Sequence, residues 1–263
     1  MAQRQPKAQT WFGLLFGTAA LIIYLPIIVM IVFSFNSGRY QVMPFRNFTW
    51  DWYGRVFQDA QFVAGFANSI TIAAAVSLTA TAIAFACAYS LVNASFPGKG
   101  AVTLLVLAPL AVPLILIGIS LRLYFVSIGF EPSLGLVYAG QVLYVLPLAV
   151  LNLRNRIAQI PKSHEEAAWA LGASRLRAIV EIVLPACKLA IAATLIITFT
   201  FAFDEFVIAY FLTNFSITLP IKIWTSLVTG FDPAINAVGA MVFSFSMILG
   251  VTAQVMFMRR DVR

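Results

Sequence analysis

Charged side chains are scarce in this 263-residue chain: Asp, Glu, Lys and Arg together make up only 10% of it, whereas 61% of the residues are apolar or aromatic. This composition excludes an ordinary soluble domain. Several uninterrupted apolar runs are long enough to cross a bilayer, whose hydrocarbon core is spanned by roughly 20 helical residues. The sequence therefore predicts an all-α, polytopic membrane protein in which residues 1–263 form one transmembrane domain.

Residues suited to binding metals or nucleotides are also few. The two cysteines, Cys87 and Cys187, lie in or at the edge of apolar runs and lack the spacing of metal ligands, so we interpret them as unpaired small core residues. The single histidine, His164, is interpreted as a solvated loop residue. Gly98-Lys99 has neither the following Ser or Thr nor the upstream glycine of a phosphate-binding loop. No nucleophile is paired with a base, so we expect neither a metal site nor a catalytic residue.

Six apolar runs are predicted to span the membrane, with edges uncertain by several residues. They lie near residues 11–35, 62–92, 101–126, 134–153, 187–212 and 235–258. The first run is longer than the apolar part of a signal peptide and is followed by no small-x-small cleavage site, so we interpret it as a retained anchor. The largest insert between spans, residues 154–186, is polar.

The distribution of Lys and Arg predicts the orientation of the chain. With a cytoplasmic N-terminus, every one of the 17 basic residues lies on the cytoplasmic side except Arg39, Arg46, Arg55, Arg122 and Lys222. Cytoplasmic loops of membrane proteins carry such an excess, so both termini are expected in the cytoplasm. The net charge of +7 then reflects a basic membrane rim and requires no nucleic-acid partner.

The polar insert is predicted to form two short helices joined by a tight turn. Ser163-x-x-Glu166 is a capping-box pattern, in which the hydroxyl and the carboxylate satisfy exposed amides, so the first helix should begin at Ser163. Gly172 should end it, because glycine enters the left-handed conformation of a C-cap without steric cost. Ser174 can cap a second helix, and Pro185 marks its junction with the fifth span. A loop that merely connects spans four and five fits this spacing equally well.

The insert follows the pattern Glu-Ala-Ala-x3-Gly-x9-Ile-x-Leu-Pro, carried by Glu166, Ala167, Ala168, Gly172, Ile182, Leu184 and Pro185. This pattern resembles the EAA loop of binding-protein-dependent ABC transporter permeases of the MetI-like type. Other segments are similar to permeases of the spermidine/putrescine group. These are residues 24–29, 33–37, 171–174, 203–208, 219–224 and 233–237.

The resemblance implies a type I ABC importer permease fold with six transmembrane helices, in a bacterial inner membrane. In that family the short helix of the EAA loop is the coupling helix, which sits in a groove of a cytoplasmic ATPase. The residues to which it assigns this coupling are Glu166, Ala167, Ala168, Trp169, Leu171 and Gly172. ATP and Mg would be bound by that ATPase, so this chain is expected to be a transport subunit rather than an enzyme. The implied partners are a second, different permease, two ATPase copies and a periplasmic or extracellular solute-binding protein.

Two adjacent acids, Asp204 and Glu205, interrupt the fifth apolar run and are the candidate residues of a solute path. Intramembrane carboxylates are costly and usually face a water-filled path or a partner charge. For a polyamine they would lower the barrier to passage. The spermidine/putrescine group is expected to have two aspartates here, so Glu205 departs from its pattern. Alternatively, the acids only end the helix at the interface, or pair with Arg122 or Lys222.

Three classes of function remain. The resemblance favours an ATP-driven ABC importer permease for a polyamine such as putrescine or spermidine, with an amino acid, a phosphonate or a similar small solute as the alternative. A secondary transporter would explain the intramembrane acids, but it should show internal repeats, and no convincing repeat relates the two halves of the sequence. A structural subunit of a membrane complex would leave the Glu-Ala-Ala pattern as a coincidence.

Overall fold

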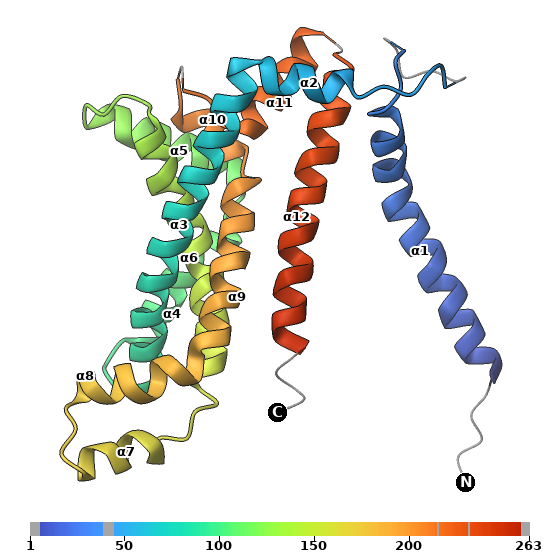
Figure 1. Cartoon of the computed structure of the whole chain (residues 1–263). Coiled ribbons are helices and arrows are strands. Elements are labelled where there is room, and N and C mark those ends of the chain that lie inside the picture. The colour runs from blue at the N-terminus through green and yellow to red at the C-terminus, as the bar shows by residue number, and fades with distance from the viewer. Residues whose placement is uncertain (1–5, 39–44, 215, 231, 259–263) are drawn as a thin grey trace. The chain divides into compact units, whose positions relative to one another are not determined.

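The computed structural model of the chain describes residues 6–38, 45–214, 216–230 and 232–258. Within these residues it consists of helices and loops, without a β-strand and with one isolated antiparallel bridge, between Asn36 and Phe48 (Figure 1). The predicted all-α fold is therefore confirmed. Several residues that support the orientation argument lie outside the described residues: Arg4, Arg39, Arg259, Arg260 and Arg263. The cytoplasmic placement of both termini stays a prediction.

The helices are named in the order in which they follow one another along the chain. In order they are α1 (Pro6–Phe33), α2 (Asp51–Gln58), α3 (Ala60–Asn93), α4 (Lys99–Leu107), η1 (Ala108–Ala111), α5 (Leu114–Ser127), α6 (Leu134–Ile157), α7 (Ser163–Ala170), α8 (Arg175–Ala178), η2 (Ile179–Val183), α9 (Leu184–Phe203), α10 (Val207–Leu212), α11 (Leu219–Thr229) and α12 (Ala234–Met258). The sequence pattern did not indicate α2 or α11. Both are short, and neither carries an apolar run long enough to have been taken as a span.

The chain divides into two compact units. The first comprises Met1–Ala60 and Ile223–Phe245, and the second comprises Gln61–Lys222 and Ser246–Arg263. The predicted coupling loop and the acidic pair both belong to the second unit. Their positions relative to each other can therefore be described directly.

Five helical stretches in the described part of the chain are long and apolar enough to cross a membrane. They are Trp11–Phe33, Ala60–Asn93, Leu134–Ile157, Arg175–Phe203 and Ala234–Thr252. A sixth is obtained when α4 and η1 are counted together with α5 as one broken span. The first, second, fourth and sixth predicted spans thus correspond to single helices, whereas the third and fifth need correction.

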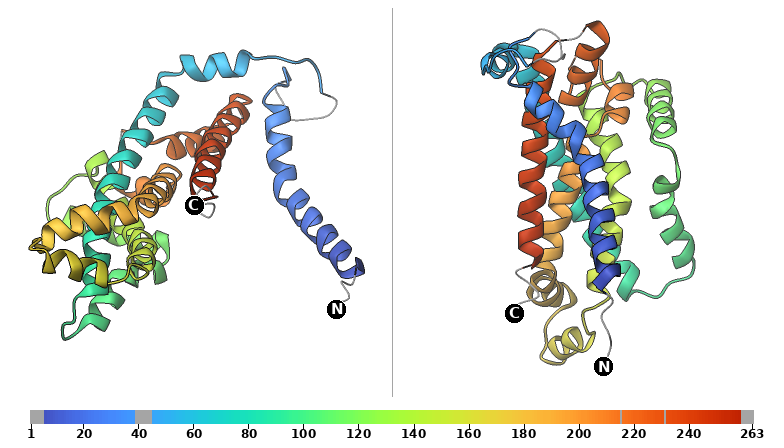
Figure 2. Two further views of the ribbon diagram at one scale, coloured as in Figure 1. Left: turned by 60° about the horizontal axis from the view of Figure 1, so that its bottom comes forward. Right: turned by 90° about the vertical axis from the view of Figure 1, so that its right-hand side faces the viewer.

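The third predicted span, residues 101–126, is not a single helix. Lys99–Ala111 and Leu114–Ser127 are bent relative to each other by 105° (Figure 2). Pro113 has no N–H to donate into a helix, and its ring disfavours a helical conformation at the residue before it. That residue, Val112, is extended, with φ −96° and ψ 129°. The proline therefore ends the first half of the run and starts the second in a new direction.

The fifth predicted span, residues 187–212, is both displaced and interrupted. Its helix begins earlier, because α8, η2 and α9 run on as one helical stretch, Arg175–Phe203. It also ends earlier, at Phe203, and α10 starts again at Val207. The expectation of one span reaching residue 212 is therefore wrong, and the acidic pair lies at the interruption.

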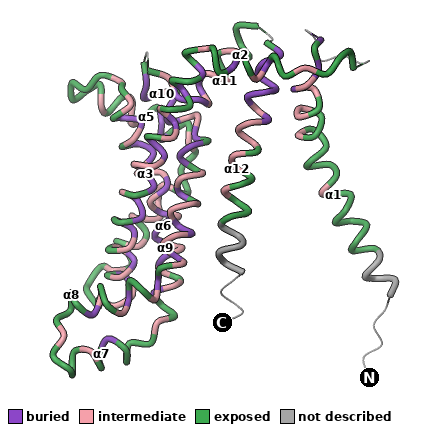
Figure 3. The backbone as a smooth tube through the Cα atoms, in the orientation of Figure 1, coloured by how far each residue is buried: buried purple, intermediate pink, exposed green. Residues whose placement is uncertain are grey.

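In the first unit, α2 is anchored to the end of α1 by polar and aromatic contacts. The indole N–H of Trp52 donates to the carbonyl of Asn36 at 2.7 Å, and the hydroxyls of Tyr53 and Ser34 lie 2.7 Å apart. The ring of Phe35 stacks on that of Phe48 at 5.0 Å. Along α1 itself, none of the apolar stretch is buried within the chain (Figure 3). Such a surface suits lipid or another membrane protein.

The second unit is a bundle in which α6 packs against α9, and α10 packs against α5 and α6. The end of the bundle nearest α7 and α8 holds a core of small and branched residues from α3, α6, η2 and α9. This core contains Ala84, Ala88, Leu91, Ala149, Val150, Leu153, Ile157, Val183, Cys187 and Ala190. Cys187 is buried in this core and Cys87 packs against it, as expected of small core residues. At the other end, a Cβ on Gly140 would lie 2.7 Å from side-chain atoms of Ile208 and Leu212, so glycine permits the close approach of α6 and α10.

Candidate functional site

The first helix of the predicted coupling loop, α7, spans Ser163–Ala170 and begins at Ser163 as expected, but it is not capped as predicted. Lys162 occupies the N-cap position and no side chain caps the helix, so the predicted capping box between Ser163 and Glu166 is wrong. The amide of Glu166 donates to the Lys162 carbonyl at 3.0 Å, and that of His164 to the Pro161 carbonyl at 3.2 Å. The first turn therefore begins ahead of Ser163, whose backbone is already helical and no longer in the cap conformation.

The end of α7 agrees with the sequence prediction. Gly172 adopts φ +88°, and its amide donates to the Trp169 carbonyl at 2.9 Å. The next amide, of Ala173, donates to the Ala168 carbonyl at 2.9 Å. These two bonds form a Schellman motif, which satisfies the last carbonyls of the helix and turns the chain sharply. The Ser174 hydroxyl then accepts from the Arg177 amide at 3.2 Å and caps α8, also as predicted.

From α8 the backbone continues into the membrane region without leaving the helical conformation. The segment η2 (Ile179–Val183) is a π-helix, and α9 follows with Pro185 in its first turn. A proline cannot donate the usual helical hydrogen bond, and widening the preceding turn accommodates it. The predicted junction at Pro185 is thus a local change of helical pitch. The stretch Arg175–Phe203 has 29 residues, about 44 Å along its helical path at 1.5 Å per residue, and it bends between α8 and α9 (Figure 1).

The surface of α7 combines small and exposed apolar residues. Glu166 and Ala167 are exposed, and Ala168 is half-buried. Trp169 is 40% exposed, and Leu171, at the turn, is 90% exposed. The guanidinium of Arg175 lies 6.0 Å from the centre of the Trp169 ring. Large apolar groups held in the open on a short rigid helix are the features of a protein-binding surface.

Glu165, which the sequence did not single out, is the buried acid of this loop. Only 5% of it is exposed, and its Oε2 accepts a hydrogen bond of 2.5 Å from the hydroxyl of Tyr89 on α3. Its neighbour Glu166 points to the exposed side. The sequence does not indicate which of two adjacent glutamates is buried, because burial depends on how α7 is rotated about its axis relative to α3.

The acidic pair lies at the interruption between α9 and α10. Asp204 is the C-cap residue of α9 and is exposed, whereas Glu205 is only 5% exposed. The Glu205 carboxylate accepts from the amide of Ile208 at 2.7 Å and from that of Ala209 at 3.0 Å. Both amides belong to the first turn of α10, which would otherwise lack acceptors. The part of the alternative in which the acids mark a helix end is therefore correct.

Arg122 and Lys222, which the sequence offered as partners of the acids, donate to other residues, whereas Gln141 contacts Glu205. The side-chain amide of Gln141 on α6 donates to Oε2 of Glu205 at 3.4 Å. The guanidinium of Arg122 donates instead to the Phe211 carbonyl at 3.0 Å. The Lys222 ammonium donates to the Gln61 side chain at 2.7 Å. The sequence analysis missed this contact of Gln141, because the sequence does not indicate which residue an amide within a helix faces.

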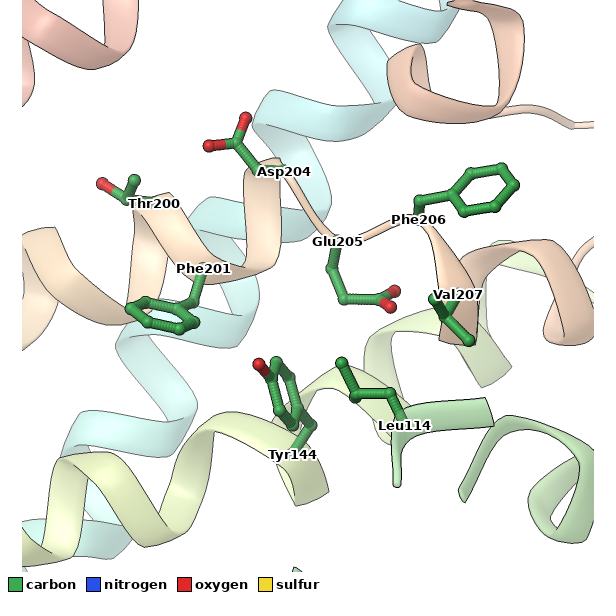
Figure 4. Close-up of a pocket in the computed structure, with 8 residues that line it drawn as sticks. All are labelled: Leu114, Tyr144, Thr200, Phe201, Asp204, Glu205, Phe206 and Val207. Carbon is green, nitrogen blue, oxygen red and sulfur yellow. The ribbon is translucent and has the colours of Figure 1, made fainter. Parts of the chain in front are cut away.

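Both acids line a pocket of about 370 Å³. The other lining residues are Leu114, Tyr144, Thr200, Phe201, Phe206 and Val207. Figure 4 shows the Glu205 carboxylate turned toward α10, and the rings of Phe201 and Tyr144 near the opening that the interrupted helix creates. A pocket lined by three aromatic rings and two carboxylates is suited to an organic cation, because ring faces and carboxylates both attract positive charge.

The predicted site residues therefore form two groups at opposite ends of one helical stretch. Those assigned to coupling lie on α7 and its terminal turn, while Asp204 and Glu205 lie at the far end of α9 (Figure 1). Within the described residues there is no cluster of His, Cys, Asp and Glu able to hold a metal ion.

Comparison with known proteins gives concordant results. The family model for binding-protein-dependent transport system inner membrane components matches residues 80–260. The chain is 29% identical over 233 residues to the spermidine/putrescine transport system permease protein PotC of Haemophilus influenzae, covering 88% of this chain and 90% of that protein. It is 29% identical over 247 residues to the putrescine transport system permease protein PotI of Escherichia coli, covering 91% and 88% respectively. The fold matches a chain of a bacterial ABC transporter for alginate import, with a TM-score of 0.73, 19% identity and 98% coverage of both chains.

The contacts of the acidic pair predict unequal effects on stability. Replacing Glu205 by alanine removes the acceptor of two buried amides, and each buried group left unsatisfied costs about 1–3 kcal/mol. Asp204→Ala alters an exposed residue and should change stability by about 0.5 kcal/mol or less. Thermal unfolding of the purified variants in lipid nanodiscs measures both. Equal losses of stability in the two variants would show that Glu205 does not hold α10.

Proposed function

We propose that a polyamine is the solute of this chain, which belongs to the family of binding-protein-dependent transport system inner membrane components and is a membrane-spanning permease subunit of an ABC importer. The observation that carries the proposal is the acidic pocket, which the helical stretch Arg175–Phe203 connects to the exposed loop helix. Movement imposed on one end of such a stretch reaches the other end as rigid-body motion. The chain therefore has the parts needed to link an energy source to a solute path.

The loop helix α7 is proposed to contact a cytoplasmic ATPase. The small side chains of Ala167 and Ala168 allow a partner to approach the helix backbone closely. Trp169 and Leu171 offer exposed apolar area, of the kind that concentrates the binding energy of an interface. Glu166 supplies an exposed carboxylate beside them. The turn at Gly172 fixes the angle between this surface and α8, and hence the direction in which a displacement is passed on.

The proposed assembly has further members. ATP and Mg would be bound by two copies of the ATPase, and this chain would carry no cofactor of its own. A second, different permease would complete the path, and a periplasmic or extracellular binding protein would deliver the solute. The exposed apolar length of α1 is consistent with a membrane environment that includes such a partner. A bacterial inner membrane is the proposed location.

A polyamine is favoured over other solutes by the chemistry of the pocket. Asp204 contributes an exposed carboxylate to the pocket lining, and Tyr144, Phe201 and Phe206 contribute aromatic rings. Ammonium groups bind to both kinds of surface. The two relatives described above are named for putrescine or spermidine transport. An anionic solute such as a phosphonate would meet like charge at the same point. A secondary transporter or a structural subunit would leave the family match unexplained.

Reconstitution tests the proposed function. The chain is placed in proteoliposomes with its second permease, its ATPase and its binding protein, and uptake of labelled putrescine and spermidine is followed with and without ATP. ATP-dependent uptake is expected, and Asp204→Asn should reduce it by roughly tenfold, the effect of losing one favourable contact of about 1.4 kcal/mol with the ammonium. The control Asp51→Asn removes the same charge from α2, outside the pocket, and should leave uptake unchanged. Uptake of another solute but not of polyamines would refute the proposed substrate.

A second prediction concerns the turn at Gly172. The substitution Gly172→Asp strains a residue at φ +88° and adds a charge beside the exposed Leu171, so ATP hydrolysis should continue while uptake per ATP falls. Gly129→Asp is the matched control, because Gly129 has φ +86° and equally open space but lies after α5. Uptake and phosphate release are measured in the same vesicles. An unchanged ratio in Gly172→Asp would count against α7 as the coupling element.

A further inference from the structure

The buried carboxylate of Glu165 links α7 to a second transmembrane helix. Its 2.5 Å hydrogen bond from Tyr89 has the length expected when a hydroxyl donates to a carboxylate. The backbone of α7 otherwise packs against α8 and η2, which lead into α9. The Tyr89–Glu165 bond therefore connects the loop helix to α3, separately from its covalent connection to α9.

At the end that carries Tyr89, α3 is firmly held in the bundle. Tyr89 packs against the core that contains Ala88 and Leu91 of α3 and Val183 of η2. Ala73, Val76, Ala80, Ala84 and Ala88 form a fully buried stripe along the helix. Small residues at such a contact let neighbouring helices approach closely. A displacement of Tyr89 is thus a displacement of α3 and not of one side chain.

The opposite end of α3 is hydrogen-bonded to the segment that follows α10. The Asn68 amide donates to the Ile217 carbonyl at 2.9 Å, and the Ser69 hydroxyl accepts from the Leu219 amide at 2.9 Å. A Cβ on Gly65 would lie 3.4 Å from backbone atoms of Thr218 and Leu219, so the two backbones are in close contact. This end of α3 cannot shift without the segment 217–219.

The same part of α3 reaches the end of α9 at the pocket. The ring of Phe66 meets that of Phe203 edge to face, with centroids 6.0 Å apart. Phe203 directly precedes Asp204. Between its two ends, α3 has 34 residues without a proline, and is about 51 Å long at 1.5 Å per residue. Figure 1 shows it running beside α9 from the level of α8 to that of α10.

We propose that Glu165 and Tyr89 are positioning residues for transport: their hydrogen bond makes α3 a second route along which movement of α7 reaches the pocket. The proposal rests on the proposed function of α7 as the coupling helix. With α9 alone, a displaced α7 would move only the residue that precedes the pocket acids. With α3 as well, the segment after α10 moves in the same step, so both sides of the interruption at Asp204 and Glu205 shift together.

The test separates the hydrogen bond from the packing of the ring. Tyr89→Phe removes only the hydroxyl, whereas Glu165→Gln keeps an oxygen that can accept from Tyr89. In the reconstituted transporter, Tyr89→Phe should lower the uptake per ATP hydrolysed by roughly tenfold, and Glu165→Gln should stay close to the wild-type ratio. Glu165→Ala should resemble Tyr89→Phe, and the double variant should be no worse than either single variant. Tyr138→Phe is the matched control, since it removes an interhelical hydroxyl bond of 2.8 Å from α6 to Thr79 of the same α3.

An unchanged ratio in Tyr89→Phe, with a wild-type transporter that is active, overturns this inference alone. A wild-type assembly that transports nothing overturns the proposed function instead. In that case hydrogen exchange of the α7 amides in the purified chain decides whether the link exists. Faster exchange over Ser163–Ala170 in Tyr89→Phe than in wild type or Tyr138→Phe supports it, and equal exchange refutes it.

Discussion

The interruption between α9 and α10 depends on a single carboxylate. In a bilayer every backbone polar group must find its partner within the protein, and a helix that ends and restarts at membrane depth leaves amides without acceptors. Glu205 accepts from the amides of Ile208 and Ala209, and Gln141 of α6 donates to the same carboxylate. Both acids line the pocket at this break, and there Asp204 is exposed while Glu205 is buried. The two adjacent acids thus have different roles: Glu205 accepts backbone hydrogen bonds, and Asp204 presents an exposed carboxylate.

The other requirement is mechanical continuity between the pocket and the loop. The stretch Arg175–Phe203 remains helical through Pro185, because η2 widens the turn ahead of it. At the loop end, the Schellman turn at Gly172 and the Ser174 cap set the direction of α7. The bond from Tyr89 to Glu165 adds α3 to this connection. A small exposed helix is thereby connected to α9 and to α3, which both reach the acidic interruption.

Local chemistry explains what the sequence predicted correctly. The left-handed turn at Gly172 and the cap at Ser174 depend on residues within a few positions of each other, and both are present. The capping box failed because Ser163 lies one residue inside the helix, a shift that the pattern does not resolve. The bend at Pro113 was missed because the hydropathy of the run is continuous across it. Contacts such as Tyr89–Glu165 join residues 76 positions apart, and depend on helix phases that the sequence alone does not specify.

The central claim is that α8, η2 and α9 move as one body, and distance measurement tests it most directly. Spin labels placed at Leu176, which is 72% exposed, and at Ile197, which is 36% exposed, lie on either side of η2. Pulsed electron paramagnetic resonance on the reconstituted transporter gives their separation without nucleotide and with bound ATP. The same distance in both states is predicted. A change in the distance would place a hinge at η2, and would contradict rigid transmission from the loop to the pocket.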